Sequence, residues 1–111
     1  MTLSERQQIF AMNVAHLILE INKRGFSCTF GEAFRTSEQA AWNAARGIGI
    51  KDSQHCKRLA VDLNLFHDGV YCTGGEEWKQ FGEYWLTLNS LNRWGGNFSR
   101  KDFNHVEMKE A

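Results

Sequence analysis

Two short segments of this chain carry residues of the kinds that hold a catalytic metal ion. His55 is followed seven positions later by Asp62, and a second histidine, His105, follows Asp102 by three positions. Imidazole and carboxylate groups suit zinc, and three such ligands leave the fourth tetrahedral position free for water. Zinc catalysis also needs a proton acceptor beside that water. We therefore expect His55, Asp62 and His105 to hold Zn²⁺ and Asp102 to act as the base.

Each of these residues alone also has an ordinary structural interpretation. His55 could be a loop histidine, Asp62 a strand carboxylate that faces solvent, and residues 102–105 a turn. Their joint placement favours metal binding, because an aspartate in the middle of an apolar strand needs a partner that offsets its desolvation. A cation is the simplest such partner.

Alternating residues predict the strands that must position these ligands. Over residues 59–66 the leucines and a valine alternate with Asp62 and its neighbours, so Asp62 points away from the apolar core. Over residues 104–108, His105 and Glu107 share one face, and Val106 and Met108 share the other. If the two strands are neighbours, both ligands lie on the same polar side.

Helices and turns complete the expected framework. Capping-box spacings predict helices that start at Ser4, Thr36 and Thr73, and the first two are expected to end near residues 24 and 45. Trp78, Phe81, Trp85 and Leu88 would share one face of the third helix. Residues 26–34 have the alternation of a half-buried strand, Asp68-Gly69 predicts a hairpin turn, and a loop over residues 47–55 leads to the first ligand. We expect an α+β fold: a small antiparallel sheet with helices packed on one face and the zinc cleft on the other.

Composition narrows the class of protein. The 13 lysines and arginines balance the 13 aspartates and glutamates, so no overall charge attracts nucleic acid or an anionic membrane. Three widely spaced cysteines argue against a disulfide framework and fit a reducing cytosol. The chain contains no proline, no linker and no repeat, which predicts one domain over residues 1–111 without a separate wall-binding module. We expect a monomer made in the cytoplasm, with no signal peptide and no membrane span.

The same residues resemble a known family. Ser53-x-His55-x6-Asp62, with Ala60 before the aspartate, and Asp102-x-x-His105 are similar to the motifs of the zinc peptidases grouped as D-alanyl-D-alanine carboxypeptidases and L-alanyl-D-glutamate endopeptidases, many of them phage endolysins. The resemblance covers residues 34–107 and includes the segment Arg35-Thr36-x-Glu38-Gln39. It implies a hedgehog-like fold around the zinc site.

The resemblance also implies roles for residues near the ligands. Arg35 would stabilise the charge that develops on the tetrahedral intermediate, although a surface ion pair with Glu38 explains it equally well. Ser53, Gln39 and Trp94 would contact the substrate. Ser53 is equally well explained as a cap, and Trp94 as a packing residue.

Two residues between the ligands depart from the simplest pattern. Arg58 stands where the family usually has glycine, so we expect a different backbone geometry there and a reshaped cleft rim. Cys56 adjoins His55, but neighbouring side chains on an extended segment point in opposite directions, so we leave the thiol out of the ligand set.

The resemblance implies a zinc metallopeptidase that hydrolyses the stem peptide of peptidoglycan. The expected activity is that of an L-alanyl-D-glutamate endopeptidase, a phage endolysin that reaches the cell wall in the periplasm after the membrane is breached and lyses the host. A D-Ala-D-Ala carboxypeptidase is the near alternative. A catalytically inactive, zinc-stabilised binding or structural domain is an alternative from another class, and a cysteine-dependent hydrolase is a third.

Overall fold

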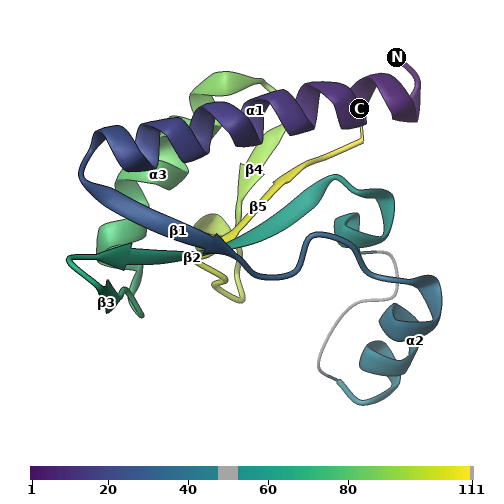
Figure 1. Cartoon of the computed structure of the whole chain (residues 1–111). Helices are drawn as coiled ribbons and strands as arrows, with labels where there is room; N and C mark the ends of the chain where they lie inside the picture. Colours follow the sequence, from purple (N-terminus) through teal and green to yellow (C-terminus); the bar gives the residue numbers. More distant parts are fainter. Residues whose placement is uncertain (48–52, 111) are drawn as a thin grey trace.

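A five-stranded antiparallel sheet and three α helices make up the described part of the chain (Figure 1). The computed structural model describes residues 1–47 and 53–110. Two short 3-10 helices, η1 and η2, lie between these elements. In chain order the elements are α1 (Leu3–Lys23), β1 (Phe26–Phe30), α2 (Ser37–Ala45), η1 (Gln54–Lys57), β2 (Ala60–His67), β3 (Val70–Tyr71), α3 (Gly75–Leu88), β4 (Asn92–Trp94), η2 (Gly95–Asn97) and β5 (His105–Met108).

Strand β2 is the centre of the sheet. The strand order is β1-β2-β5-β4, and β3 pairs with the end of β2. The second half of β2 pairs with β1, and its first half pairs with β5, in a register that sets Asp62 directly opposite His105. The two ligand-bearing strands are therefore neighbours, as the alternation required.

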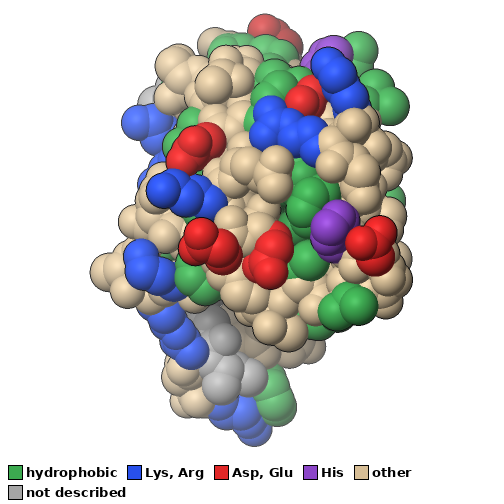
Figure 2. Space-filling view, turned by 90° about the vertical axis from the view of Figure 1, so that its left-hand side faces the viewer, with side chains coloured by type: hydrophobic (Ala, Val, Ile, Leu, Met, Phe, Trp, Pro, Cys, Tyr) green, Lys and Arg blue, Asp and Glu red, His purple; other side chains and the backbone are tan. Residues whose placement is uncertain are grey.

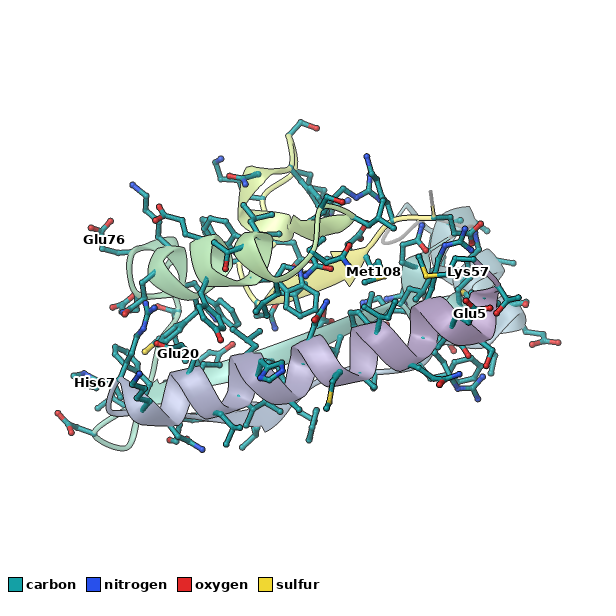
Figure 3. All side chains as sticks on the ribbon, turned by 90° about the horizontal axis from the view of Figure 1, so that it is seen from above. Glu5, Glu20, Lys57, His67, Glu76 and Met108 are labelled. Atoms are coloured by element: carbon teal, nitrogen blue, oxygen red, sulfur yellow. The ribbon has the colours of Figure 1, made fainter. Side chains whose placement is uncertain are left out.

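Helices α1 and α3 lie side by side over one face of the sheet (Figures 1 and 3). The alternating residues Leu59, Val61, Leu63 and Leu65 of the β2 region are all nearly or fully buried against them. Trp78 and Trp85 of α3, Leu17 and Ile21 of α1, and Val106 and Met108 of β5 close the same core. The expected α+β architecture is confirmed, with one difference: α2 lies apart from α1 and α3 (Figure 1).

Two of the three predicted helix caps were wrong. Helix α1 begins before Ser4, because the hydroxyl of Thr2 accepts a hydrogen bond from the Glu5 amide at 3.1 Å. Thr2 and Glu5 have the capping-box spacing themselves. Helix α3 is capped by Gly74, without a side-chain hydrogen bond, rather than by Thr73. The cap of α2 is Thr36, as predicted, with its hydroxyl 3.0 Å from the Gln39 amide.

The strands also differ from the predicted bounds. β1 ends at Phe30, and the chain beyond it bonds to β2 irregularly: the Gly31 amide donates to the Asp62 carbonyl and the Asp62 amide to the Glu32 carbonyl. The three-residue strand β4 was not predicted, because so short a segment shows no periodicity. The middle of the predicted loop over residues 47–55 lies outside the described residues.

The hairpin between β2 and β3 is confirmed. Asp68 and Gly69 both have positive φ, 51° and 77°, as a two-residue turn of type I′ requires. Cys28, Cys56 and Cys72 are all free thiols. Acidic and basic side chains are interspersed on the face shown in Figure 2. Within the described ranges, no helix combines the length and the apolar character needed to cross a membrane.

Candidate metal centre

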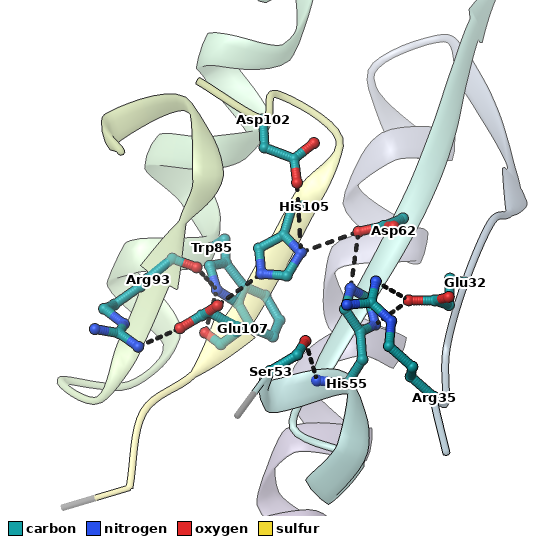
Figure 4. A network of polar contacts seen from close by, with 10 residues as sticks. All are labelled: Glu32, Arg35, Ser53, His55, Asp62, Trp85, Arg93, Asp102, His105 and Glu107. Atoms are coloured by element: carbon teal, nitrogen blue, oxygen red, sulfur yellow. Dashed lines mark hydrogen bonds and ion pairs between the residues drawn. The ribbon is translucent and has the colours of Figure 1, made fainter. Parts of the chain in front are cut away.

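Three side chains from two strands and η1 converge where β2 pairs with β5 (Figure 4). One carboxylate oxygen of Asp62, Oδ1, lies 3.3 Å from Nε2 of His55 and 3.0 Å from Nδ1 of His105. The two imidazole rings meet edge to face, with centroids 5.0 Å apart. The structure thus brings together the three residues that the sequence suggested as metal ligands.

The segment around His55 is shaped by local backbone contacts. Ser53 caps η1, and its hydroxyl accepts a hydrogen bond from the His55 amide at 3.2 Å. Arg58 ends η1 in the left-handed conformation, with φ 55°, and the Leu59 amide then donates to the Gln54 carbonyl. This tight turn leads directly into β2, so that His55 and Asp62 face each other.

The cluster fits a small divalent metal ion. The ligand atoms of His55, Asp62 and His105 all lie within 4.8 Å of one another. Ligands held at about 2.0–2.1 Å from a tetrahedral zinc lie roughly 3.3 Å apart, close to the two nitrogen–oxygen distances given above. Both histidines are buried, at 2% and 6% exposure, while 22% of the Asp62 side chain stays exposed. The donor set is the two imidazoles and one carboxylate typical of a catalytic site.

Asp62 and His105 shift each other's pKa in opposite directions. Burial acts to raise the pKa of Asp62, but hydrogen bonds with His105 and His55 outweigh it and lower that pKa to about 2. Burial acts to lower the pKa of His105, but hydrogen bonds with Asp62 and Glu107 outweigh it and raise that pKa to about 9. A bound cation would replace the proton on His105, since a metal ligand must be the neutral imidazole.

Asp102 lies beside the cluster on the side of the shared oxygen. Its carboxylate Oδ2 is 3.9 Å from Nδ1 of His105, the ring nitrogen that also faces Asp62. Although 53% of its side chain is exposed, burial raises the pKa of Asp102, and the negative charge of Asp62 raises it further. A raised pKa makes this carboxylate a better proton acceptor, so its place and its environment both fit the predicted base.

Arg35 also lies at the cluster, but with a different partner from the one considered from the sequence. Its guanidinium forms an ion pair with Glu32, three residues before it, and not with Glu38. The same Glu32 oxygen lies 3.6 Å from Nδ1 of His55. Only 15% of the Arg35 side chain is exposed, and its Nε is buried without a hydrogen-bond partner among the described residues.

Three residues around the cluster were missed in the sequence. Glu107 Oε1 lies 2.6 Å from Nε2 of His105, and its other oxygen is paired with Arg93. Glu32 holds the corresponding place at His55. The one available signal was the alternation that puts Glu107 on the same face as His105, two positions away. Neither Arg93 nor Glu32 belongs to a motif. Arg93 reaches the site through its pairing with Glu107 between β4 and β5, and Glu32 through the hydrogen bond that its carbonyl accepts from the Asp62 amide.

The three predicted substrate contacts have clear structural partners. Ser53 is 4% exposed and acts as the cap described above. Gln39 lies on the surface of α2, where its amide donates to the Asn43 side chain at 2.7 Å. Trp94 is 6% exposed, belongs to the core cluster, and donates from Nε1 to the Phe103 carbonyl at 2.8 Å. Of the two roles open for Trp94, the structure shows packing, and contact with substrate stays a prediction for all three.

Gly95 and Gly96 bring the backbone close to other parts of the protein itself. A Cβ atom on Gly95 would lie 2.1 Å from the Asp102 carbonyl oxygen, and one on Gly96 would lie 2.3 Å from the Trp94 ring. At Arg58, where a different backbone geometry was expected from the family pattern, the residue adopts the left-handed conformation that glycine favours. Its guanidinium lies 4.0 Å from the centre of the Phe34 ring.

Comparisons with known proteins give a matching family and similar solved structures. The family model described as D-alanyl-D-alanine carboxypeptidase matches residues 47–108, more than half of the chain. A comparison with curated proteins gave no match. The fold is similar to that of the L-Ala D-Glu endopeptidase ChiX of Serratia marcescens, with a TM-score of 0.65 and 19% identity over 75% of this chain and 67% of that chain.

A second solved structure is similar over more of this chain. It is a zinc complex of a mutant of the vancomycin-resistance D,D-pentapeptidase VanY from the VanB-type cassette. The TM-score is 0.61, with 17% identity over 89% of this chain and 70% of that chain. At 19% and 17% identity, the two similarities establish that this chain has the same fold as ChiX and VanY.

Proposed function

This chain belongs to the D-alanyl-D-alanine carboxypeptidase family, and we propose that it is a zinc-dependent peptidase that hydrolyses the stem peptide of peptidoglycan. The observation that carries this proposal is the convergence of His55, Asp62 and His105, with Asp102 3.9 Å from His105. Three ligands and a separate carboxylate are the parts that metal-assisted peptide hydrolysis needs.

We assign zinc to the cluster. Two imidazoles and one carboxylate suit it, the ligand atoms have suitable spacings, and the similar VanY structure holds Zn(II). Bound zinc supplies a Lewis acid that polarises a carbonyl group and lowers the pKa of a bound water from 15.7 toward about 7.

Asp102 is the residue that we assign to proton transfer. Its carboxylate lies beside the metal-facing nitrogen of His105 and keeps contact with solvent. It would accept the proton of the attacking water and later pass it to the leaving amine. Burial and the charge of Asp62 raise its pKa, so the proton it takes up is held more firmly than by an ordinary aspartate.

Arg35 is the residue that we assign to charge stabilisation. Its pairing with Glu32 holds the guanidinium beside His55, and the unpartnered Nε is a donor that substrate oxygen could use. A fixed guanidinium stabilises the negative charge that develops on the carbonyl oxygen during attack.

For the bond that is cut, we propose the one between L-Ala and D-Glu. The motif pattern of the endolysin type and the fold similarity to ChiX support this choice. Removal of the terminal D-alanine is the second candidate, favoured by the description of the matching family and by the similarity to VanY.

Digestion of purified sacculi separates these candidates. Protein loaded with zinc should release stem peptides, with new D-Glu amino termini detected by mass spectrometry, and a chelator should stop the release until zinc is restored. Free D-alanine without new D-Glu termini would point to the carboxypeptidase. Unchanged muropeptides from zinc-loaded protein would contradict the proposed function altogether.

We further propose that the peptidase acts in phage-induced lysis, on the strength of the motif resemblance alone. Zinc-loaded protein added to Gram-negative cells should clear the suspension when the outer membrane has been permeabilised. Intact turbidity of permeabilised cells, with sacculi of the same strain digested, would contradict this role.

A further inference from the structure

Behind the metal-facing side of His105 lies a chain of polar contacts that runs through the buried Glu107 to the partly exposed Arg93 (Figure 4). His105 has two ring nitrogens with different surroundings. Nδ1 faces Asp62 and Asp102, and Nε2 lies 2.6 Å from Oε1 of Glu107. The second oxygen of Glu107 is paired with the guanidinium of Arg93.

An ionised Glu107 side chain is unfavourable at this buried position unless its lost hydration is compensated. Its side chain is 7% exposed, and an ionised carboxylate at such a position needs partners on both oxygens. It has them, since His105 binds one oxygen and Arg93, its cross-strand partner in β4, binds the other. Both oxygens of this buried carboxylate therefore have a partner that offsets its desolvation.

The backbone beside Glu107 is fixed as well. Nε1 of the fully buried Trp85 lies 3.1 Å from the Glu107 carbonyl oxygen and 3.0 Å from the Arg93 carbonyl oxygen. One indole N–H thus ties β4 and β5 together at the residues that form the ion pair. This leaves the carboxylate of Glu107 little freedom to move away from His105.

The arrangement at the other histidine is looser. Nδ1 of His55 lies 3.6 Å from Glu32, beyond hydrogen-bond distance, and has no hydrogen-bond partner among the described residues. Glu32 is 35% exposed, against 7% for Glu107. The two histidines therefore differ, and the one at which the second ring nitrogen is firmly held is His105.

We propose that Glu107, held by Arg93, is a positioning residue that fixes the His105 ring and its proton so that Nδ1 is free to bind the metal. A hydrogen bond from Nε2 to a carboxylate determines which nitrogen carries the proton and makes the other a stronger ligand. The inference rests on the proposed function only in that it takes the cluster to be a metal site. It assigns Glu107 no contact with substrate.

Metal affinity is the measurement that tests this role. Loss of such a partner weakens metal binding by about 10- to 100-fold. We expect Glu107→Gln, which keeps an oxygen acceptor but loses the charge, to weaken zinc binding about 10-fold in a chelator competition. Glu107→Ala should weaken it more. Glu83→Gln, at an exposed position of α3, is the matched control and should bind zinc as the unchanged protein does.

A purely structural role gives a different result. In that case Glu107→Gln would lower the unfolding midpoint of the metal-free protein but leave zinc affinity within twofold, and the inference would be overturned. The imidazole ¹⁵N spectrum adds a second readout: with zinc bound, the His105 Nε2 proton should exchange with solvent faster in Glu107→Gln than in the unchanged protein. Equal exchange rates would also overturn the inference.

If Glu107→Ala does not fold, the glutamine variant decides the matter alone. The test of Glu107 and the test of the proposed function can fail independently of each other. Unchanged protein that binds zinc tightly but leaves sacculi intact would contradict the peptidase and leave the role of Glu107 standing. If the unchanged protein digests sacculi but Glu107→Gln binds zinc with undiminished affinity, the proposed function stands and the role of Glu107 is contradicted.

Discussion

At the scale of single residues, the site is governed by one carboxylate oxygen shared between two imidazoles. Asp62 Oδ1 lies within 3.3 Å of both His55 and His105, and Asp102 lies close behind. Without a metal ion, a proton on His105 takes the role of the cation and pairs with Asp62 and Glu107. Proton and metal ion therefore compete for the same nitrogen.

This competition predicts how the stability of the metal-free protein depends on pH. The pKa of His105 is about 9 in the folded protein, against an ordinary value of 6.5. A raised pKa means that the stabilisation is fully present below 6.5 and is lost as the pH rises through about 9. From that shift, the loss is on the order of 3 kcal/mol in the free energy of unfolding. Asp62, whose pKa is lowered to about 2, stabilises the folded protein above pH 3.8. This stabilisation is lost as the pH falls from 3.8 through about 2.

Urea unfolding of metal-free protein at several pH values checks this prediction. The free energy of unfolding should fall between pH 6.5 and 9, whereas zinc affinity should rise over the same range, because zinc needs the neutral imidazole. His105→Gln should remove the fall, and His16→Gln, at an exposed position of α1, should retain it. A flat profile in the unchanged protein would contradict the assignment.

At the scale of elements, the backbone of η2 and the segment before β5 determine where Asp102 lies. The Asp102 amide donates to the Gly95 carbonyl at 2.9 Å, and the His105 amide donates to the Asp102 carbonyl at 3.1 Å. Gly95 allows this approach because it has no Cβ. The atom that a side chain would meet, 2.1 Å away, is backbone and has no rotamer to change.

Gly95→Ala should therefore displace the Asp102 segment. We expect a loss of about 1–3 kcal/mol in the free energy of unfolding, as for other overpacked positions, together with a loss of peptidase activity. Gly74→Ala is the comparison for overpacking, because its Cβ would have 3.9 Å of clearance from the nearest atom, and it loses only the preference of the α3 N-cap for glycine over alanine. Denaturant unfolding of both variants measures the difference, and equal stability of the two would show that the η2 backbone can relax.

At the scale of the whole molecule, the helices on one face and the ligands at the junction of β2 and β5 could be predicted from the sequence. The alternation around Asp62 and His105 reveals which residues share a face, because a buried core imposes it on each strand separately. The Arg93–Glu107 pair could not be predicted, because it depends on the register of β4, a strand too short to show a pattern. The cap at Thr2 was missed because two overlapping segments have the same capping spacing.

The same limit applies to the interpretation of Arg58 and the glycines. Sequence alone identified Arg58 as a departure from the family pattern, but not that its backbone would take the left-handed conformation. Nor does the sequence reveal which groups approach Gly95 and Gly96, which are the Asp102 carbonyl oxygen and the Trp94 ring. The type of residue indicates which backbone conformations and close contacts are possible at a position. Which group makes the contact depends on tertiary packing.

The most direct test of the central claim is to count bound zinc and measure sacculus digestion in the same preparations of unchanged protein and Asp102→Asn. If Asp102 is the base of a zinc peptidase, both proteins should hold one zinc ion per chain, and the variant should digest sacculi about 10²- to 10⁴-fold more slowly. A variant that holds zinc and digests sacculi as fast as the unchanged protein would contradict the account.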